Sequence, residues 1–511
     1  MTAKLVTLGD SLTHGFQHGA IRRTEWSYPA MVARVLADPS FLQPDFSGAG
    51  VGGPMVDLEL LMRRLTAACG EQLGFLEIPK AALTIQRFMS QVEDYWERGA
   101  GTEPSATGPI HRNLGVWGFE VLDALTLSDG VCFRNTPPAT DNLINQLPEL
   151  GMYRSARRVF NPAQRAELEE YKPLDLARQI AKTEGGIDNL IVELGSNNAL
   201  GTCVRMKLKW SQSADFRKLA HQRSCTIWEP EHFSRIYRRL AEQISQVGAR
   251  RVFLATVPHV TVAPVTRGVS PFAKQRGTPE LVRAPGAPED SRGYFEYYTR
   301  FWIWDDDFNP ARDPFLARED AILIDSVIDE YNECIRAVAE ERGFHVIDLC
   351  RVLDDLAYRS NDGRPKYRFP QGLIQALQQN PATAFRVRPD GTILLDTRYL
   401  QLPDRPPPAG APSTEWQQQY TGGLFGLDGV HPTTIGYGVI AHEVLSSMRE
   451  QGVLEADPLL LPWAEIVAAD TLVTDPPLIL GSLARTLDVL FGKLGLERLI
   501  DKLAGYGAED D

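Results

Sequence analysis

Short apolar runs that alternate with stretches of helical spacing set the strongest limit on how this chain can fold. The stretch Glu231–Val247 shows such spacing, because its apolar residues recur at steps of three and four. Four apolar runs of strand length follow stretches of this kind or open the chain: Lys4–Leu8, Asn189–Leu194, Arg251–Thr256 and Phe344–Leu349. Strands that alternate with helices form a parallel sheet, so we predict an α/β protein with a doubly wound parallel sheet.

The spaces between these runs are too long for simple crossover connections. With 511 residues the chain exceeds most single domains, but one core with insertions can reach this length. We expect one domain with three insertions and a helical C-terminal extension: residues 1–450, interrupted at about 54–110, 262–320 and 355–420, followed by 451–511. The last insertion should contain a hairpin, because Asp390 and Gly391 form a turn sequence.

Charge and cysteine content exclude several classes of protein. The formal net charge is -13, and nucleic-acid binding needs concentrated Lys and Arg, so no nucleic-acid partner is expected. The six cysteines include no C-x-x-C pair and no Cys/His cluster along the sequence, which indicates neither a zinc site nor a disulfide scaffold. No signal-like segment and no run approaching about 20 apolar residues is present, so a cytoplasmic protein is expected.

A Gly-Asp-Ser-Leu turn follows the first apolar run and places Ser11 where that strand ends. Ligands of parallel sheets bind beyond the carboxyl ends of the strands, so Ser11 is a candidate nucleophile. A serine hydroxyl needs a base and an orienting carboxylate. His431 and Asp428 have a suitable spacing in "GLDGVHP", although an isolated pair of this kind is more often a turn carboxylate and a loop histidine.

Hydrolysis through a tetrahedral intermediate also needs donors for an oxyanion. The segment "VELGSNNALG" offers Gly195 and Asn197 directly after a predicted strand, and "RNLGVWGFEV" offers Gly118 in a turn. Each has an ordinary structural explanation, because glycine often makes a turn after a strand and asparagine often caps a helix. Gly53 in "FSGAGVGG" is an alternative to Gly118.

Taken together and in this order, the four segments resemble the GDSL family of serine esterases and lipases, also called SGNH hydrolases. The resemblance covers short motifs between Gly9 and Gly438, whereas the insertions between them resemble nothing identified. It implies a three-layer α/β/α sandwich around about five parallel strands, related to the flavodoxin-like order. The third motif departs from the family's usual G-x-N-D, because Asn198 stands where the family has aspartate.

The resemblance also implies a role for each motif residue. Ser11 would be the nucleophile, with its own backbone N–H in the oxyanion hole; Asn197 would add a side-chain donor and Gly118 a backbone donor. His431 would act first as base and then as acid, with Asp428 as its orienting carboxylate. The expected activity is hydrolysis of a small-molecule or lipid ester, without a metal or organic cofactor.

Other functions use the same residues or none of them. Acyl transfer to an alcohol and thioester hydrolysis would share the site, and a non-catalytic binding protein could keep the fold. The Leu-rich segment 476–511 could form an apolar face that touches a membrane, but packing on the protein itself is favoured. The sequence does not indicate an oligomeric state.

An aromatic cluster in the insertion 262–320 leaves the sheet at the same edge as Ser11. Eight rings crowd into this cluster: Tyr294, Phe295, Tyr297, Tyr298, Phe301, Trp302, Trp304 and Phe308. They could line a pocket over the active site or form the insertion's own core, and both possibilities remain open at this point.

Overall fold

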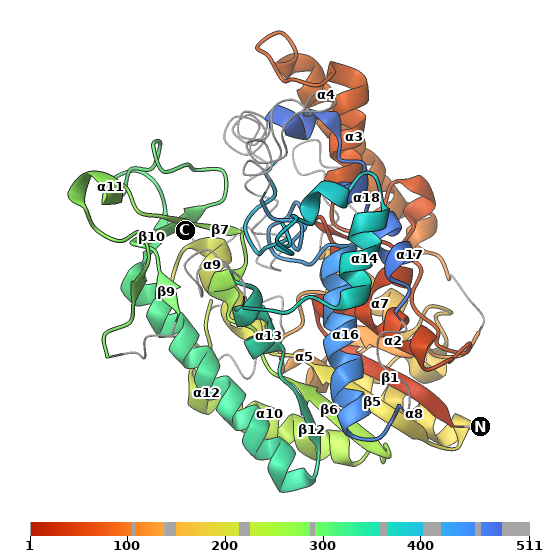
Figure 1. The fold of residues 1–511 in the computed structure, drawn as a ribbon. Helices are drawn as coiled ribbons and strands as arrows, with labels where there is room; N and C mark the ends of the chain where they lie inside the picture. Colours follow the sequence, from red (N-terminus) through yellow and green to blue (C-terminus); the bar gives the residue numbers. More distant parts are fainter. Residues whose placement is uncertain are drawn as a thin grey trace.

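Five parallel strands form the central sheet of the computed structural model (Figure 1). They are β1 (Ala3–Gly9), β4 (Asn113–Gly115), β5 (Ile187–Glu193), β6 (Arg251–Ala255) and β12 (His345–Ile347). Their order across the sheet is β4-β1-β5-β6-β12, and each neighbouring pair is parallel. The predicted α/β class and parallel sheet are confirmed. Four strands coincide with the predicted apolar runs, whereas β4 has only three residues and the sequence indicated a turn there.

The structure describes residues 2–482 except for 105–107, 137, 139–149, 214–224, 287–291, 358–365, 402–420 and 455–460. Within these residues no helix is both long and apolar enough to cross a membrane.

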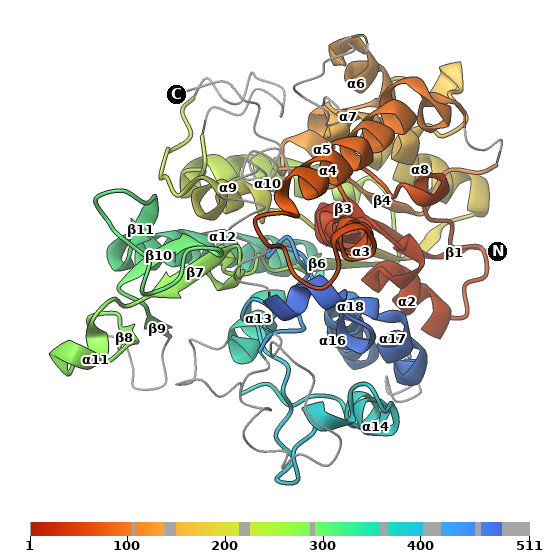
Figure 2. The same cartoon turned by 90° about the horizontal axis from the view of Figure 1, so that it is seen from above.

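Helices lie on both sides of the sheet (Figure 2). One side carries α2 (Tyr28–Val35) and α16 (Thr434–Glu450), and the other carries α8 (Pro173–Glu184), α10 (Pro230–Ser245) and α12 (Arg318–Arg342). Shorter helices complete the core: α1 (Ser11–His14), α5 (Asp123–Thr126), α6 (Asp129–Asn135), α7 (Gly151–Phe160), α9 (Asn197–Arg205) and α13 (Leu349–Leu356). Because both faces of the sheet are covered, strands such as β1 are almost entirely buried, which explains their apolar sequences.

The carboxyl ends of β4, β1 and β5 lie level with one another. Gly9 at the end of β1 pairs with Gly115 on one side and with Glu193 on the other. A Cβ atom on Gly9 would lie 2.1 Å from Oγ1 of Thr13 and 2.6 Å from the backbone oxygen of Glu193. Only glycine fits this junction, so α1 can begin directly beyond the strand.

The segments predicted as insertions each contain secondary structure outside the central sheet. The first contains α3 (Leu58–Cys69) and α4 (Ile78–Glu93), with the hairpin β2 (Phe16–Gln17) and β3 (Ala20–Ile21) preceding it. The second contains α11 (Ala273–Arg276), β7 (Thr266–Val269), β8 (Val282–Arg283), β9 (Gly293–Tyr294), β10 (Tyr297–Arg300) and β11 (Phe315–Ala317), and its main sheet is antiparallel in the order β11-β10-β7. The third contains α14 (Gln371–Gln379).

The predicted turn at Asp390 and Gly391 is confirmed. An antiparallel bridge joins Val387 to Ile393 on its two sides. The backbone N–H of Thr392 donates to the Asp390 carboxylate at 2.9 Å, which closes the tip of the turn.

The described part of the C-terminal extension packs on the core. It contains α17 (Trp463–Ala469) and α18 (Thr471–Thr474). The Trp463 ring packs against Gly438 of α16, where an added Cβ would lie 2.8 Å from the ring. The Asp470 carboxylate accepts a hydrogen bond from the backbone N–H of Ile435 at 2.9 Å and so satisfies the first turn of α16. Most of the apolar face expected over 476–511 lies outside the described residues.

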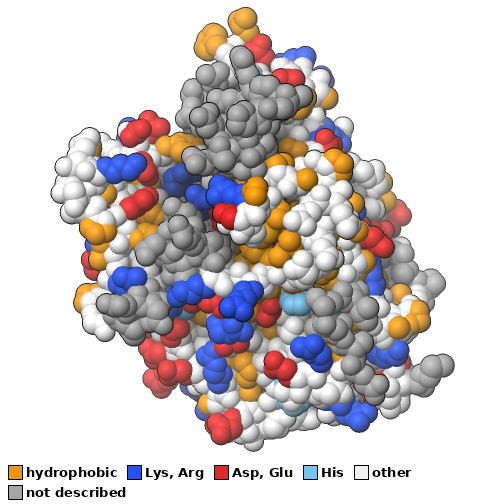
Figure 3. All heavy atoms as spheres, in the orientation of Figure 1, with side chains coloured by type: hydrophobic (Ala, Val, Ile, Leu, Met, Phe, Trp, Pro, Cys, Tyr) orange, Lys and Arg blue, Asp and Glu red, His pale blue; other side chains and the backbone are white. Residues whose placement is uncertain are grey.

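Charged side chains of both signs are spread over the face drawn in Figure 3, with hydrophobic side chains gathered near its centre. This mixture fits the sequence, in which 66 acidic and 53 basic residues are interspersed.

The close packing at Gly9 generates a stability prediction. Gly9→Ala should lower the free energy of unfolding by about 1 to 3 kcal/mol, because the new methyl group meets a backbone oxygen that cannot move without disturbing β5. Chemical denaturation measures the loss. Gly108→Ala is the matched control, since no atom lies within 4 Å of a Cβ placed there. Equal destabilisation by the two substitutions would contradict the steric explanation.

Candidate active site

Ser11 is the first residue of α1 and lies immediately beyond β1. The Asp10 side chain caps this helix by accepting a hydrogen bond from the backbone N–H of Leu12 at 3.1 Å. On α16, the hydroxyl of Tyr437 donates to the backbone oxygen of Phe16 at 2.7 Å and lies 3.4 Å from that of Ser11. The turn that carries Ser11 is therefore held from both the sheet and a covering helix.

His431 and Asp428 form a direct pair in the loop before α16. Nδ1 of His431 lies 3.1 Å from Oδ2 of Asp428, and both side chains are buried. A proton on Nδ1 is held by the carboxylate, which leaves Nε2 as the acceptor. This is the local pairing that the D-x-x-H spacing predicts.

The Asp428 carboxylate is surrounded by hydrogen-bond donors. Oδ1 accepts from the backbone N–H groups of Val430 and His431, each at 2.9 Å, and Oδ2 accepts from that of Gly19 at 2.6 Å. Burial favours the protonated acid, but the neighbouring imidazole and these hydrogen bonds outweigh it and lower the pKa of Asp428. Asp428 is therefore ionised at neutral pH and can stabilise an imidazolium at His431.

Residues near the start of the chain hold the His431 loop in place. The backbone N–H of Leu427 donates to Nδ1 of His18 at 3.1 Å. The ring of Phe16 packs against the imidazole of His431, with 4.5 Å between the ring centroids. The loop is thus fixed by the same N-terminal segment that follows Ser11.

Ser11 and His431 line one cavity of about 100 Å³. Its walls are mainly apolar and come from α1, α9, the segment 258–263, α13 and α16, with Leu12, Leu200, Val260, Leu353 and Ile440 as examples. Among the described residues, no hydrogen bond joins Oγ of Ser11 to Nε2 of His431. Hydrogen bonds of catalytic groups are often long before substrate binds, so this geometry is compatible with a serine and its base.

Asn197 begins α9 beyond the end of β5 and also lines the cavity. Its amide nitrogen donates to Oδ2 of Asp10 at 3.1 Å and to the backbone oxygen of Phe119 at 3.0 Å. The structure therefore brings Asn197 beside the Ser11 turn, as the motif predicts. Both hydrogens of the Asn197 amide already have acceptors, so one of these acceptors would have to be replaced by the substrate oxygen. The predicted oxyanion contact therefore stays a prediction.

The two candidate oxyanion glycines lie in different places. Gly118 follows β4 with a φ of 78°, and the backbone N–H of the preceding Trp117 donates to Nδ1 of His14 in α1 at 3.2 Å. His14 can accept because burial lowers its pKa to about 3 and keeps it neutral. Gly53 packs on β3, where a Cβ would lie 2.3 Å from the oxygen of Ile21. Neither glycine is among the described residues that line the cavity, so the preference for Gly118 stays a prediction.

Two buried carboxyl groups lie beneath Ser11, and the motifs alone do not reveal their pairing. Burial raises the pKa of Asp10 to about 6, although hydrogen bonds from Leu12 and Asn197 oppose the shift. Burial and the neighbouring Asp10 raise the pKa of Glu193 well above its ordinary value, while Thr13 donates to its Oε2 at 3.0 Å. Burial therefore favours the protonated form of both carboxyl groups. The available sequence signal for this buried pair was Glu193 itself, a charged residue directly after the apolar residues 190–192.

The aromatic cluster of the second insertion does not line this cavity. Phe301 stacks on Tyr399 with 4.6 Å between ring centroids, and Trp304 packs under the guanidinium of Arg267 at 3.7 Å. Of the two possibilities that the sequence left open, packing within the insertion's own core is the one that these contacts favour. Phe301 thus packs against the third insertion and Trp304 within its own.

Comparisons with known proteins identify no relative. No family model, no curated protein and no solved structure matches this chain. The resemblance to the GDSL family therefore rests on the sequence motifs and stays a prediction.

The buried pair generates a pH prediction. The raised pKa of Asp10 means that its contribution to stability is present at low pH and is lost as pH rises through about 6. The asparagine of the Asp10→Asn variant cannot ionise. As pH rises from 5 to 7, the free energy of unfolding of this variant should therefore fall by about 1 kcal/mol less than that of the native protein. Chemical denaturation across this range measures the difference.

The exposed Asp306→Asn is the control for removing a carboxylate, and it should follow the native curve. If Asp10→Asn follows the native curve as well, Asp10 does not titrate in this window and the described pairing is incorrect.

Proposed function

We propose that this protein hydrolyses carboxylic esters through an acyl-enzyme intermediate on Ser11, with His431 as base and Asp428 as its orienting carboxylate. The observation that carries the proposal is that a serine at a strand end and a carboxylate-bound histidine line one apolar cavity. These groups come from opposite ends of the chain, so their meeting does not follow from local sequence. A serine, a histidine and a carboxylate in this relation perform acyl transfer on several unrelated folds.

The reaction would proceed in two balanced halves. Nε2 of His431 takes the proton of Ser11 as Oγ attacks the ester carbonyl, and the imidazolium then gives that proton to the departing alcohol. Water attacks the acyl-serine in the second half, with His431 again taking a proton and returning it to Oγ. Asp428 remains ionised throughout, because its hydrogen bonds hold its pKa low.

The proposed oxyanion donors lie beyond the ends of β1 and of its two neighbours, β4 and β5. We assign the backbone N–H of Ser11, the amide of Asn197 and the backbone N–H of Gly118 to this role. Asp10 already holds the Asn197 amide beside the Ser11 turn. A negative charge that develops on the substrate oxygen could therefore accept a hydrogen bond from this amide in place of Asp10.

The arrangement of the sheet supports the same family of folds. Numbered along the chain, the five strands lie in the order 2-1-3-4-5, which is the order of flavodoxin-like sheets. With helices on both faces, we infer the three-layer α/β/α architecture of the SGNH hydrolases.

The cavity favours esters with a small apolar group. Its volume of about 100 Å³ is below the range of about 300 to 1,000 Å³ typical of pockets for larger ligands. Transfer of the acyl group to an alcohol other than water would use the same residues. Product analysis with an added acceptor alcohol distinguishes transfer from hydrolysis.

The nucleophile is tested with a fluorophosphonate probe and aryl esters of short acids. Ser11→Ala should abolish labelling and lower kcat/KM by more than about 10,000-fold, because the covalent intermediate can no longer form. Ser196→Ala is the matched control, since Ser196 lines the same cavity but its buried hydroxyl has no hydrogen-bond partner among the described residues. A probe adduct mapped by mass spectrometry to any other serine would overturn the assignment.

The oxyanion role of Asn197 is tested by comparison with its neighbour. Asn197→Ala should lower kcat by roughly 100- to 1,000-fold with little change in KM, because the donor acts mainly when charge develops. Asn198→Ala should have a much smaller effect on kcat, since Oδ1 of Asn198 accepts from the backbone N–H of Val121 at 3.2 Å and serves the fold. The reverse pattern would show that the motif alignment is displaced by one residue.

A further inference from the structure

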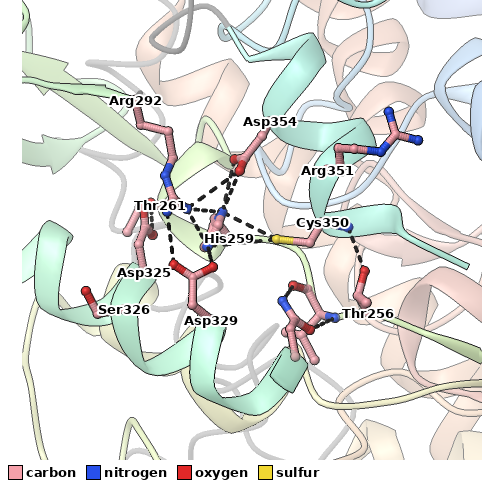
Figure 4. Close-up of polar contacts among 12 residues, drawn as sticks. Thr256, His259, Thr261, Arg292, Asp325, Ser326, Asp329, Cys350, Arg351 and Asp354 are labelled. Atoms are coloured by element: carbon pink, nitrogen blue, oxygen red, sulfur yellow. Dashed lines mark hydrogen bonds and ion pairs between the residues drawn. The ribbon is translucent and has the colours of Figure 1, made fainter. Parts of the chain in front are cut away.

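Sulfur, nitrogen and oxygen ligand atoms meet beside the apolar cavity, outside the Ser11 site (Figure 4). His259 follows β6, while Cys350 and Asp354 lie on α13. Residues four apart share one face of a helix, so both α13 side chains point toward the imidazole. Figure 4 shows this convergence and shows Arg351 of the same helix pointing away from it.

The three side chains are close enough to hold one ion. Sγ of Cys350 lies 3.4 Å from Nδ1 of His259, and Oδ2 of Asp354 lies 2.9 Å from the same nitrogen. One ligand atom from each residue lies within 4.8 Å of the others. Ligands of a tetrahedral zinc ion, bound at about 2.0 to 2.3 Å, are roughly 3.2 to 3.8 Å apart. Small side-chain movements would therefore bring all three onto a single ion.

The other nitrogen of His259 has the partner that metal-binding histidines usually have. Nε2 lies 3.1 Å from Oδ1 of Asp329 on α12. A carboxylate at the far ring nitrogen fixes the orientation of the imidazole and leaves Nδ1 for the metal.

We propose that His259, Cys350 and Asp354 bind one zinc ion, with His259 bound through Nδ1. Thiolate, imidazole and carboxylate together favour zinc over magnesium or calcium, which prefer oxygen ligands alone. Cys350 and His259 are 5% and 2% exposed, whereas the Asp354 side chain is 22% exposed and leaves a path for the ion.

The positively charged guanidinium of Arg292 lies against the His259 imidazole. Its Nη1 lies 2.7 and 2.6 Å from the two ring nitrogens of His259, and its Nη2 lies 2.9 Å from Oδ2 of Asp329. A guanidinium and a zinc ion would compete for the space beside Nδ1. The Arg292 side chain is 26% exposed, so binding of the ion would require its Nη1 to turn from Nδ1 toward solvent.

The ion would join two walls of the Ser11 cavity. His259 lines this cavity, and so do Val352 and Leu353 of α13. Zinc bound between His259 and α13 would fix these walls relative to each other. The proposed ion takes no part in the Ser11 reaction, and its binding does not depend on the proposed esterase function.

Metal binding by the full chain tests the proposal. Protein stripped with a chelator should bind one zinc ion per chain, measured by titration and elemental analysis. Cobalt in place of zinc should give a thiolate-to-cobalt charge-transfer band. Cys350→Ser should abolish this band and lower zinc affinity by more than about 100-fold, while Asp329→Asn should lower affinity by about 10- to 100-fold.

Matched controls separate this cluster from general metal binding. Cys132→Ser removes another buried cysteine, and Asp355→Asn removes a carboxylate of α13 that pairs with Arg351 at 3.2 Å. Both should bind zinc as the native chain does, and so should Ser11→Ala, whatever its effect on ester hydrolysis. Absence of micromolar zinc binding by the folded native chain, or equal binding by Cys350→Ser, would overturn the proposal and leave an ion-pair network around Arg292.

Discussion

The pairing of β1 with a parallel strand on each side is the constraint on which the candidate site depends. It brings three strand ends level, so that residues from separate parts of the sequence begin helices or turns at one edge. Gly9 makes this possible because a side chain there would collide with the β5 backbone. Ser11, Asn197 and the Gly118 turn are neighbours for this reason alone, since no local sequence connects them.

Two aspartates near this edge show how hydrogen-bond partners decide the charge of a buried group. Asp428 accepts three backbone N–H groups and faces an imidazole, so its pKa is lowered despite burial. Asp10 is equally buried, but its hydrogen bonds do not outweigh the effect of burial, and its pKa is raised. The fold therefore places a carboxylate with a lowered pKa behind His431, and two carboxyl groups with raised pKa values, Asp10 and Glu193, beneath Ser11.

The sequence predicted the features that depend on local pattern. Apolar runs identified four strands, and the Asp428–His431 pair was correct because three residues of one loop bring the two side chains together. β4 was missed because three residues carry too little pattern. The sequence left the placement of the aromatic rings open, because a partner such as Tyr399, on which Phe301 stacks, lies in another insertion. Likewise, His259 and Cys350 are 91 positions apart, so no spacing motif connects the proposed metal ligands.

The hydrogen bond between Gly19 and Asp428 spans 409 positions of the chain. Together with the contacts of Leu427 with His18 and of His431 with Phe16, it holds the His431 loop beside the Ser11 turn. During synthesis the first strand and its serine leave the ribosome long before the histidine loop is made. Contacts of such long range form late, because the entropy of closing the loop must be overcome first. Under the proposed function, a nascent or C-terminally truncated chain would therefore carry Ser11 without its base, and esterase activity would arise only when these contacts have formed.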